Sequence, residues 1–123
     1  MERIEEFIRN GKKIIYIDFS GFKSSAEFKD LIEIIKPIIT NHLPNSLYTI
    51  TNMENVRLDS ETKLVAKEFM EHNKPYVKYS VIIGLDGIKK YMVYTVAKLS
   101  GRQNTNYTFT KDQAMEWLMQ QDT

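Results

Sequence analysis

Hydrophobic positions along the chain follow two kinds of spacing, which predict strands and helices in alternation. Nearly continuous apolar or β-branched runs predict strands at residues 13–19, 47–53, 79–85 and 106–109. Apolar residues at helical spacing predict helices near residues 24–39, 59–73, 86–100 and 110–118. No internal repeat interrupts this order. It predicts an α/β fold in which right-handed crossovers connect largely parallel strands, with about four helices packed on the sheet.

The N-terminal segment carries a hairpin signal. Asn10-Gly11 suits a type I′ turn, because both residues accept a positive φ. The turn separates residues 3–9 from the strand at 13–19 and therefore predicts an antiparallel pair at this end of a mixed sheet. A helical turn over residues 2–9 is the alternative, since Ile4, Phe7 and Ile8 also fit helical spacing.

Local signals mark the start of each helix. Ser24 begins a capping box, and a second capping box opens the last helix. The second helix begins at Asp59 or Ser60, and Asp86 is the expected cap of the third. Pro37 interrupts the apolar face of the first helix, so a kink or a break is expected just before it.

The composition is that of a globular protein. The 123 residues, 42% hydrophobic and 27% charged, predict one domain spanning 1–123. A net charge of +1 does not indicate a surface that binds nucleic acid. The chain has no cysteine, its N-terminus is acidic, and no apolar run reaches the length of a membrane span. We therefore expect a cytoplasmic protein without stable membrane insertion.

Catalytic and metal-binding signatures are missing from the sequence. His42 and His72 lie near helix ends and lack the spacing of a zinc site. Gly84 and Gly87 are not followed by the residues of a phosphate-binding loop. We predict no catalytic residues, no metal and no cofactor.

Polar residues do follow the expected strands, at the edge where α/β sheets often bind ligands. Asp18, Ser20, Asp86 and Gly87 form this candidate ligand rim, with Asp59 nearby. One interpretation is a surface for an anion, a nucleotide or phosphate exchange. The alternative is structural: the aspartates are helix caps, and Ser20 belongs to a turn.

The third helix has more apolar residues than one buried face needs. The residues expected to face the sheet are Ile88, Met92, Val96 and Leu99. The residues left for another partner are Tyr91, Val93, Tyr94 and Ala97. The basic residues around them are Lys89, Lys90, Lys98 and Arg102. Three interpretations remain open: a homodimer or partner-protein interface, a lipid-facing helix, or burial under neighbouring helices.

The start of the second helix resembles a known motif. In anti-sigma factor antagonists, which carry the STAS domain, Met-Asp-Ser-Ser-Gly opens a helix and its second serine is phosphorylated. Here the run is Leu58-Asp59-Ser60-Glu61-Thr62, with Glu61 in place of that serine. Leu99-Ser100-Gly101 and Gln113-Ala114 continue the likeness, which is strongest to small stand-alone bacterial STAS-like proteins. The resemblance implies a STAS-like fold and marks Asp59, Ser60 and Glu61 as a candidate anion or phosphorylation site.

Three functions fit these observations. The leading one is a non-catalytic STAS-like interaction module, with regulation or ligand sensing as an extension. The second is a carrier of a small molecule or lipid, with an apolar cavity beside the third helix. The third is an enzyme that uses Asp18, Ser20 and Asp59. A large closed apolar cavity favours the carrier, and an exposed apolar helix face favours the module.

Overall fold

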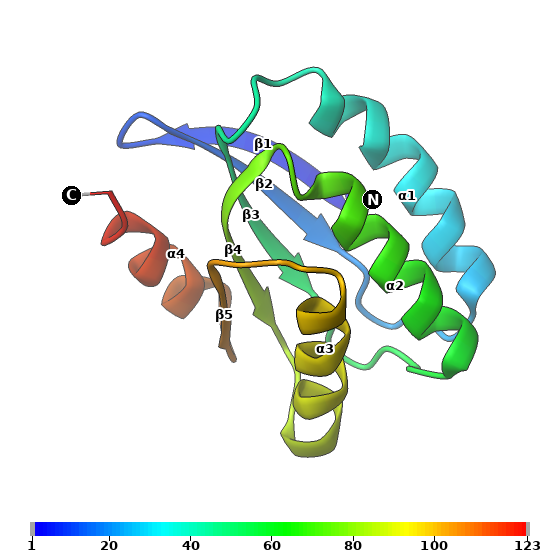
Figure 1. The fold of residues 1–123 in the computed structure, drawn as a ribbon. Helices are drawn as coiled ribbons and strands as arrows, with labels where there is room; N and C mark the ends of the chain where they lie inside the picture. Colours follow the sequence, from blue (N-terminus) through cyan, green and yellow to red (C-terminus); the bar gives the residue numbers. More distant parts are fainter. Residues whose placement is uncertain (1, 123) are drawn as a thin grey trace.

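A computed structural model describes residues 2–122, within which the chain forms five strands and four helices (Figure 1). In chain order the elements are β1 (Ile4–Arg9), β2 (Lys12–Asp18), α1 (Ser25–Thr40), β3 (Leu47–Asn52), α2 (Ser60–Asn73), β4 (Val77–Ile83), α3 (Gly87–Leu99), β5 (Thr105–Thr108) and α4 (Lys111–Met119). The predicted mixed α/β architecture is confirmed. Most predicted boundaries lie within two residues of the observed ones.

The strands form a single sheet whose spatial order, β1-β2-β3-β4-β5, is the order of the chain. β1 pairs with β2 in antiparallel fashion, and every other neighbouring pair is parallel. Asn10 and Gly11 have φ values of 53° and 78°, as the hairpin turn requires. The helical alternative for residues 2–9 is therefore wrong.

This strand order decides which face each helix covers. A right-handed crossover that always steps to the next strand in the same direction places its helix on the same face every time. Accordingly α1, α2 and α3 lie side by side on one face, while α4 contacts β3, β4 and β5 on the other (Figure 1). Each face therefore has its own hydrophobic core.

The core under α1, α2 and α3 contains a group of packed aromatic rings. The ring of Phe28 from α1 stacks on Phe19 with centroids 4.9 Å apart, and Phe22 meets Phe28 edge-on at 5.4 Å. Phe69 from α2 approaches Phe19 at 6.1 Å. The second core lies between α4 and the sheet and consists of Ile14, Tyr48, Ile50, Val81, Ile83, Ala114 and Leu118.

Two details of the helices differ from expectation. The expected break at Pro37 does not occur, because α1 runs on to Thr40. A proline removes one backbone donor, and the fully buried Ile35 and Ile39 on either side hold the helix against the sheet. The apolar residue Leu64, which helical spacing with Phe69 predicts to be buried, is 56% exposed and faces outward.

Candidate functional site

Asp59 begins α2 and is its N-cap. The Asp59 carboxylate accepts a hydrogen bond from the backbone N–H of Thr62 at 2.8 Å, which lowers the pKa of Asp59. Glu61 in the first turn accepts a hydrogen bond from the Ser25 hydroxyl and lies 3.4 Å from Lys29 Nζ, and both contacts lower its pKa. The Glu61 carboxylate thus connects α2 to α1.

Ser60 lies between these two carboxylates and is exposed. A phosphate on Ser60 would add negative charge beside Asp59 and Glu61, which are ionised at neutral pH because their pKa values are lowered. We therefore expect Ser60 to be phosphorylated less readily than a serine at a helix start without acidic neighbours.

The roles of Asp59 and Ser60 can be separated by mutation. Asp59→Ala is expected to lower the melting temperature by a few degrees, because Thr62 loses the acceptor of its backbone N–H. Ser60→Ala is expected to change stability by less than about 0.5 kcal/mol, because the Ser60 hydroxyl caps nothing. Paired thermal melts at neutral pH measure both variants, and a larger loss in Ser60→Ala would reverse the assignment.

The candidate ligand rim does not form one site. The Asp18 carboxylate accepts from the Ser20 backbone N–H at 2.8 Å, and Arg3 donates to the backbone oxygens of Asp18 and Ser20. These contacts close a turn. Asp86 and Gly87 are exposed at the start of α3, and the Asp86 side chain makes no capping hydrogen bond.

The strand order explains this separation. Asp18 is in register with Asn52 on β3, which is in register with Ile83 on β4, so the ends of β2 and β4 lie about 10 Å apart. The loop after β3 fills the space between these two strand ends. There the backbone N–H of Gly21 donates to the backbone carbonyl oxygen of Glu54 at 2.9 Å. Ligand crevices at strand ends arise where the strand order reverses, and this sheet has no reversal.

Several residues of α3 lie on the opposite side of the helix from the one expected, so that residues expected to be exposed are buried and the reverse. Val93 and Ala97, assigned to a free interface, are 3% and 4% exposed and pack inward. Ile88 and Leu99, assigned to the sheet, are 79% and 69% exposed. The helix packs closely through its small residues and turns its larger ones outward. Of the four predicted interface residues, only Tyr91 and Tyr94 are exposed.

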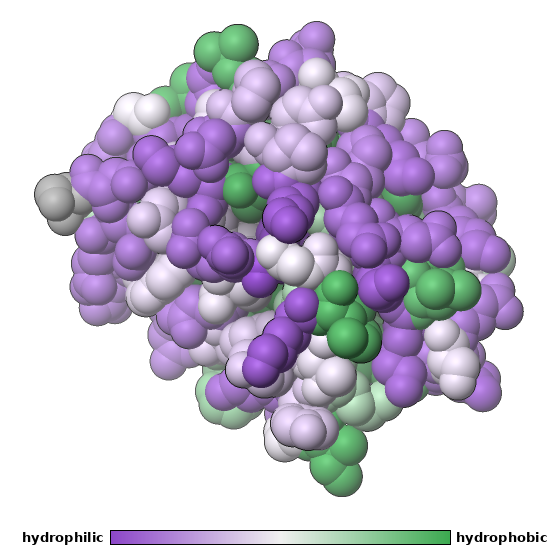
Figure 2. Space-filling view, viewed as in Figure 1, coloured by the Kyte–Doolittle hydropathy of each residue, from purple (hydrophilic) through white to green (hydrophobic). Residues whose placement is uncertain are grey.

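Five large apolar side chains make up an exposed region that we call the α3 patch: Ile88, Tyr91, Tyr94 and Leu99 on α3, and Phe109 at the end of β5. Tyr94 bridges helix and strand through an edge contact with Tyr107 at 6.3 Å. Figure 2 shows hydrophobic surface at the tip of α3, and other hydrophobic areas are visible elsewhere on the same face. An apolar surface of this kind commonly marks a binding site.

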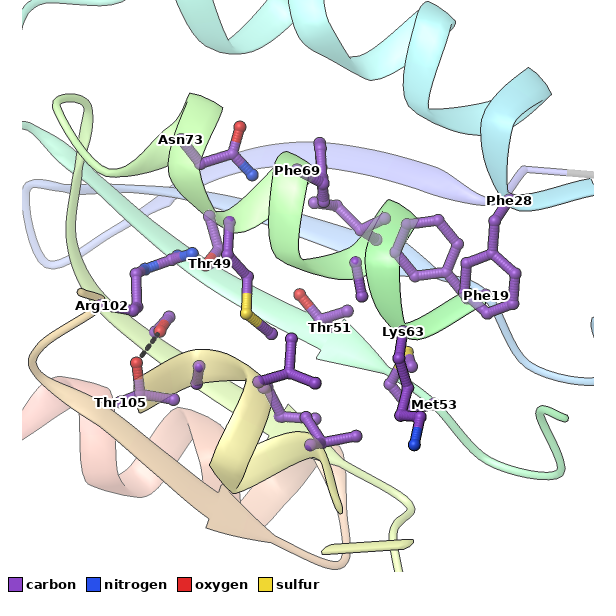
Figure 3. A pocket seen from close by; sticks show the side chains of 18 of the residues that line it. Phe19, Phe28, Thr49, Thr51, Met53, Lys63, Phe69, Asn73, Arg102 and Thr105 are labelled. Carbon is purple, nitrogen blue, oxygen red and sulfur yellow. Dashed lines mark hydrogen bonds between the residues drawn. The ribbon is translucent and has the colours of Figure 1, made fainter. Parts of the chain in front are cut away.

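A small cavity lies between the sheet and helices α2 and α3, with a volume of about 50 Å³ (Figure 3). Its walls are mostly apolar, but polar side chains gather at one end: Thr49, Asn73, Ser80, Arg102 and Thr105. The sequence did not predict this group, and Arg102 was expected among the basic residues around the apolar residues of α3. One feature of the sequence could have indicated this group. Hydroxyl residues recur at inward-facing positions of strands that are otherwise apolar.

The remaining titratable groups have structural partners. His42 Nε2 lies 3.4 Å from a Glu6 oxygen, and His72 Nδ1 lies 2.9 Å from the Asn73 side-chain oxygen. Among residues 2–122, no three His, Asp or Glu side chains are grouped so that they could hold a metal ion. In the same part of the chain, no helix has the length and hydrophobicity needed to cross a membrane.

Solved structures share this architecture. A protein of the DUF3478 family with a SpoIIAA-like fold, from Shewanella loihica, matches with a TM-score of 0.71 and 9% identity, over 94% of this chain and 91% of that one. An anti-sigma-factor antagonist (STAS) domain protein from Planctomyces limnophilus matches with a TM-score of 0.59 and 8% identity, over 94% and 97%. The chain therefore has a STAS-like fold. No family model and no curated protein sequence matches it.

Proposed function

We propose that this protein is a non-catalytic interaction module of STAS-like fold that docks on an acidic partner protein through the α3 patch. One observation carries the proposal: four large apolar side chains of a single helix are left 48–79% exposed. Leaving such surface in water is unfavourable, and a partner that covers it recovers the hydrophobic free energy.

The charge around the α3 patch favours a particular kind of partner. Lys90 and Lys98 are exposed on α3, and the helix has no acidic residue between Gly87 and Leu99. A symmetric dimer through this face would bring the lysines of two copies together. A different protein, with apolar side chains bordered by Asp and Glu, fits the patch better than a second copy does.

The carboxylates support a role without catalysis. The side chains of Glu27, Asp59, Glu61 and Asp122 are held as hydrogen-bond acceptors, which lowers their pKa values. A general acid or base needs a pKa near the working pH, and these shifts move in the opposite direction. The small cavity, about 50 Å³, also gives no support to a carrier of a whole lipid chain.

Photo-crosslinking in the cells that produce the protein tests this docking surface. A photoreactive residue at position 91, where Tyr91 is 70% exposed, should yield one discrete adduct with an acidic protein. The same residue at position 64 is the matched control, because Leu64 is 56% exposed but lies on α2. Lys90→Glu with Lys98→Glu should reduce the adduct at least about tenfold through like-charge repulsion.

A second charge control uses α2. Lys67→Glu reverses a partly exposed lysine whose ion pair with Glu71 lies within the same helix, and it should leave the adduct unchanged. Equal adducts from positions 91 and 64 would contradict the proposed surface. An adduct formed only with a second copy of the chain would replace the acidic partner with a homodimer.

A further inference from the structure

Arg102 is a half-buried charged side chain without a partner of opposite charge, and its Nε is fully buried. It follows Gly101 at the end of α3, and its side chain extends into the cavity toward Thr49 (Figure 3). Within residues 2–122, no side chain forms an ion pair or hydrogen bond with the guanidinium, and Nε is a buried donor without an acceptor. Buried charges in folded proteins are normally paired, because desolvation without compensation is costly.

The groups facing Arg102 are hydrogen-bonding side chains rather than acids. Thr49, Ser80 and Thr105 are in register on β3, β4 and β5, so their hydroxyls form a row across the sheet beneath the guanidinium. The Ser80 and Thr105 hydroxyls bond each other at 2.9 Å. Thr49 is 2% exposed and lines the cavity beside them. Asn73 borders the same end from α2.

The charge of this site is entirely positive. Among residues 2–122, no Asp or Glu lines the cavity, and its other basic group, Lys63, lies at the opposite end from Arg102 (Figure 3). Burial lowers the pKa of Arg102 to about 10, which still leaves it protonated at neutral pH. An anion would therefore find a cation and nearby hydroxyl groups in a region of low dielectric, where each charge-assisted hydrogen bond is strengthened.

The rest of the cavity is apolar and small, so it suits a small apolar part of a ligand. Phe69 and Met70 from α2, Val93 and Ala97 from α3, and Ile82 from β4 line its apolar part. A volume of about 50 Å³ corresponds to roughly four water molecules. This space suits a carboxylate that carries a chain of a few carbons.

We propose that this cavity binds a small aliphatic monocarboxylate, with its carboxylate on Arg102 and its chain against the apolar wall. The two carboxylate oxygens accept parallel hydrogen bonds from the planar guanidinium, and the Thr49 hydroxyl donates a further one. Water molecules are the competing occupants. They would solvate Arg102 but would leave its charge uncompensated.

Calorimetric titration with butyrate tests this site, and uncharged butyramide is the matched probe for charge. Wild-type protein should bind butyrate, and Arg102→Met should weaken binding by roughly 10- to 100-fold because a charge-assisted pair is lost. Thr49→Val, which keeps the shape and removes the hydroxyl, should weaken it by a smaller factor. Arg57→Met is the control, since Arg57 is exposed and does not line the cavity.

Stability measurements separate lost binding from lost folding. Without ligand, Arg102→Met should melt at the same temperature as wild type or higher, because methionine removes an uncompensated buried charge while filling similar space. Butyrate should raise the melting temperature of the wild type and leave that of Arg102→Met unchanged.

Three results would overturn the site: equal butyrate affinity in wild type and Arg102→Met, equal affinity for butyrate and butyramide, or binding of octanoate that does not depend on Arg102. The last would indicate an apolar cavity without an anion site. Arg102 is not part of the α3 patch, so these results are independent of the docking experiment.

Discussion

Phe28→Ala is expected to lower the free energy of unfolding by about 3–5 kcal/mol. Phe28 is 2% exposed and joins α1 to the sheet through its stacked contact with Phe19 and its edge contact with Phe22. Its side chain also lines the existing cavity, so truncation enlarges a void instead of allowing the surroundings to close around it. Urea unfolding followed by far-UV circular dichroism measures the loss.

Phe109→Ala is the matched control for Phe28→Ala. It removes the same atoms from a ring that is 67% exposed, and it should change the stability of the isolated protein by about 0.5 kcal/mol or less. Similar losses in the two variants would mean that the aromatic group around Phe28 does not hold α1 in place.

Leu118→Ala is the second large expected effect, a loss of about 2–5 kcal/mol. Leu118 is fully buried, and among the described helices α4 alone covers its face of the sheet. The chain's single tryptophan, Trp117, contacts Tyr79 at 5.8 Å, so its fluorescence reports whether α4 remains docked. Leu64→Ala removes the same atoms from a 56% exposed leucine on α2 and should be close to neutral.

The outcome for Leu118→Ala also distinguishes two ways in which α4 can fail. Loss of tryptophan contact at lower denaturant than the loss of helix signal would show that α4 detaches first. A single transition would show that both cores unfold together. A cost below about 1 kcal/mol would contradict the assignment of Leu118 to a tightly packed core.

Most helix starts and strands could be predicted from the sequence because their causes are local. The capping boxes at Ser24 and Thr110 form as the pattern indicates, each with its side-chain and backbone bonds in place. The Asn10-Gly11 turn likewise depends only on residues that accept a positive φ. The packing of helices on the sheet is not local, and there the predictions were less accurate.

The faces of α3 show the difficulty. Hydrophobicity favours Ile88 and Leu99 as buried residues, yet the helix buries Val93 and Ala97. Smaller side chains allow α3 to approach α2 and the sheet closely, and the crossover geometry fixes which arc is turned inward. Neither factor can be read from the periodicity of one helix whose apolar residues occupy more than one face.

The candidate sites were harder to predict for a related reason. The ligand rim assumed that Asp18 and Asp86 would converge, which needs a reversal of strand order that this sheet lacks. The side chain of Arg102 could not be placed at the cavity, because an arginine after a helix end is ordinarily solvated. Its position depends on three strands bringing Thr49, Ser80 and Thr105 into one row.

The placement of β5 has a consequence for how the interior exchanges with solvent. β5 is an edge strand of four half-buried residues that pairs only with β4, and the segment from Arg102 leads directly into it. Short edge elements open at a lower free energy than the central strands, so backbone amides of β5 should exchange with deuterium well before those of β3. If the proposed anion binds at Arg102, the same opening would widen its way to the guanidinium while α1, α2 and the central strands stay folded.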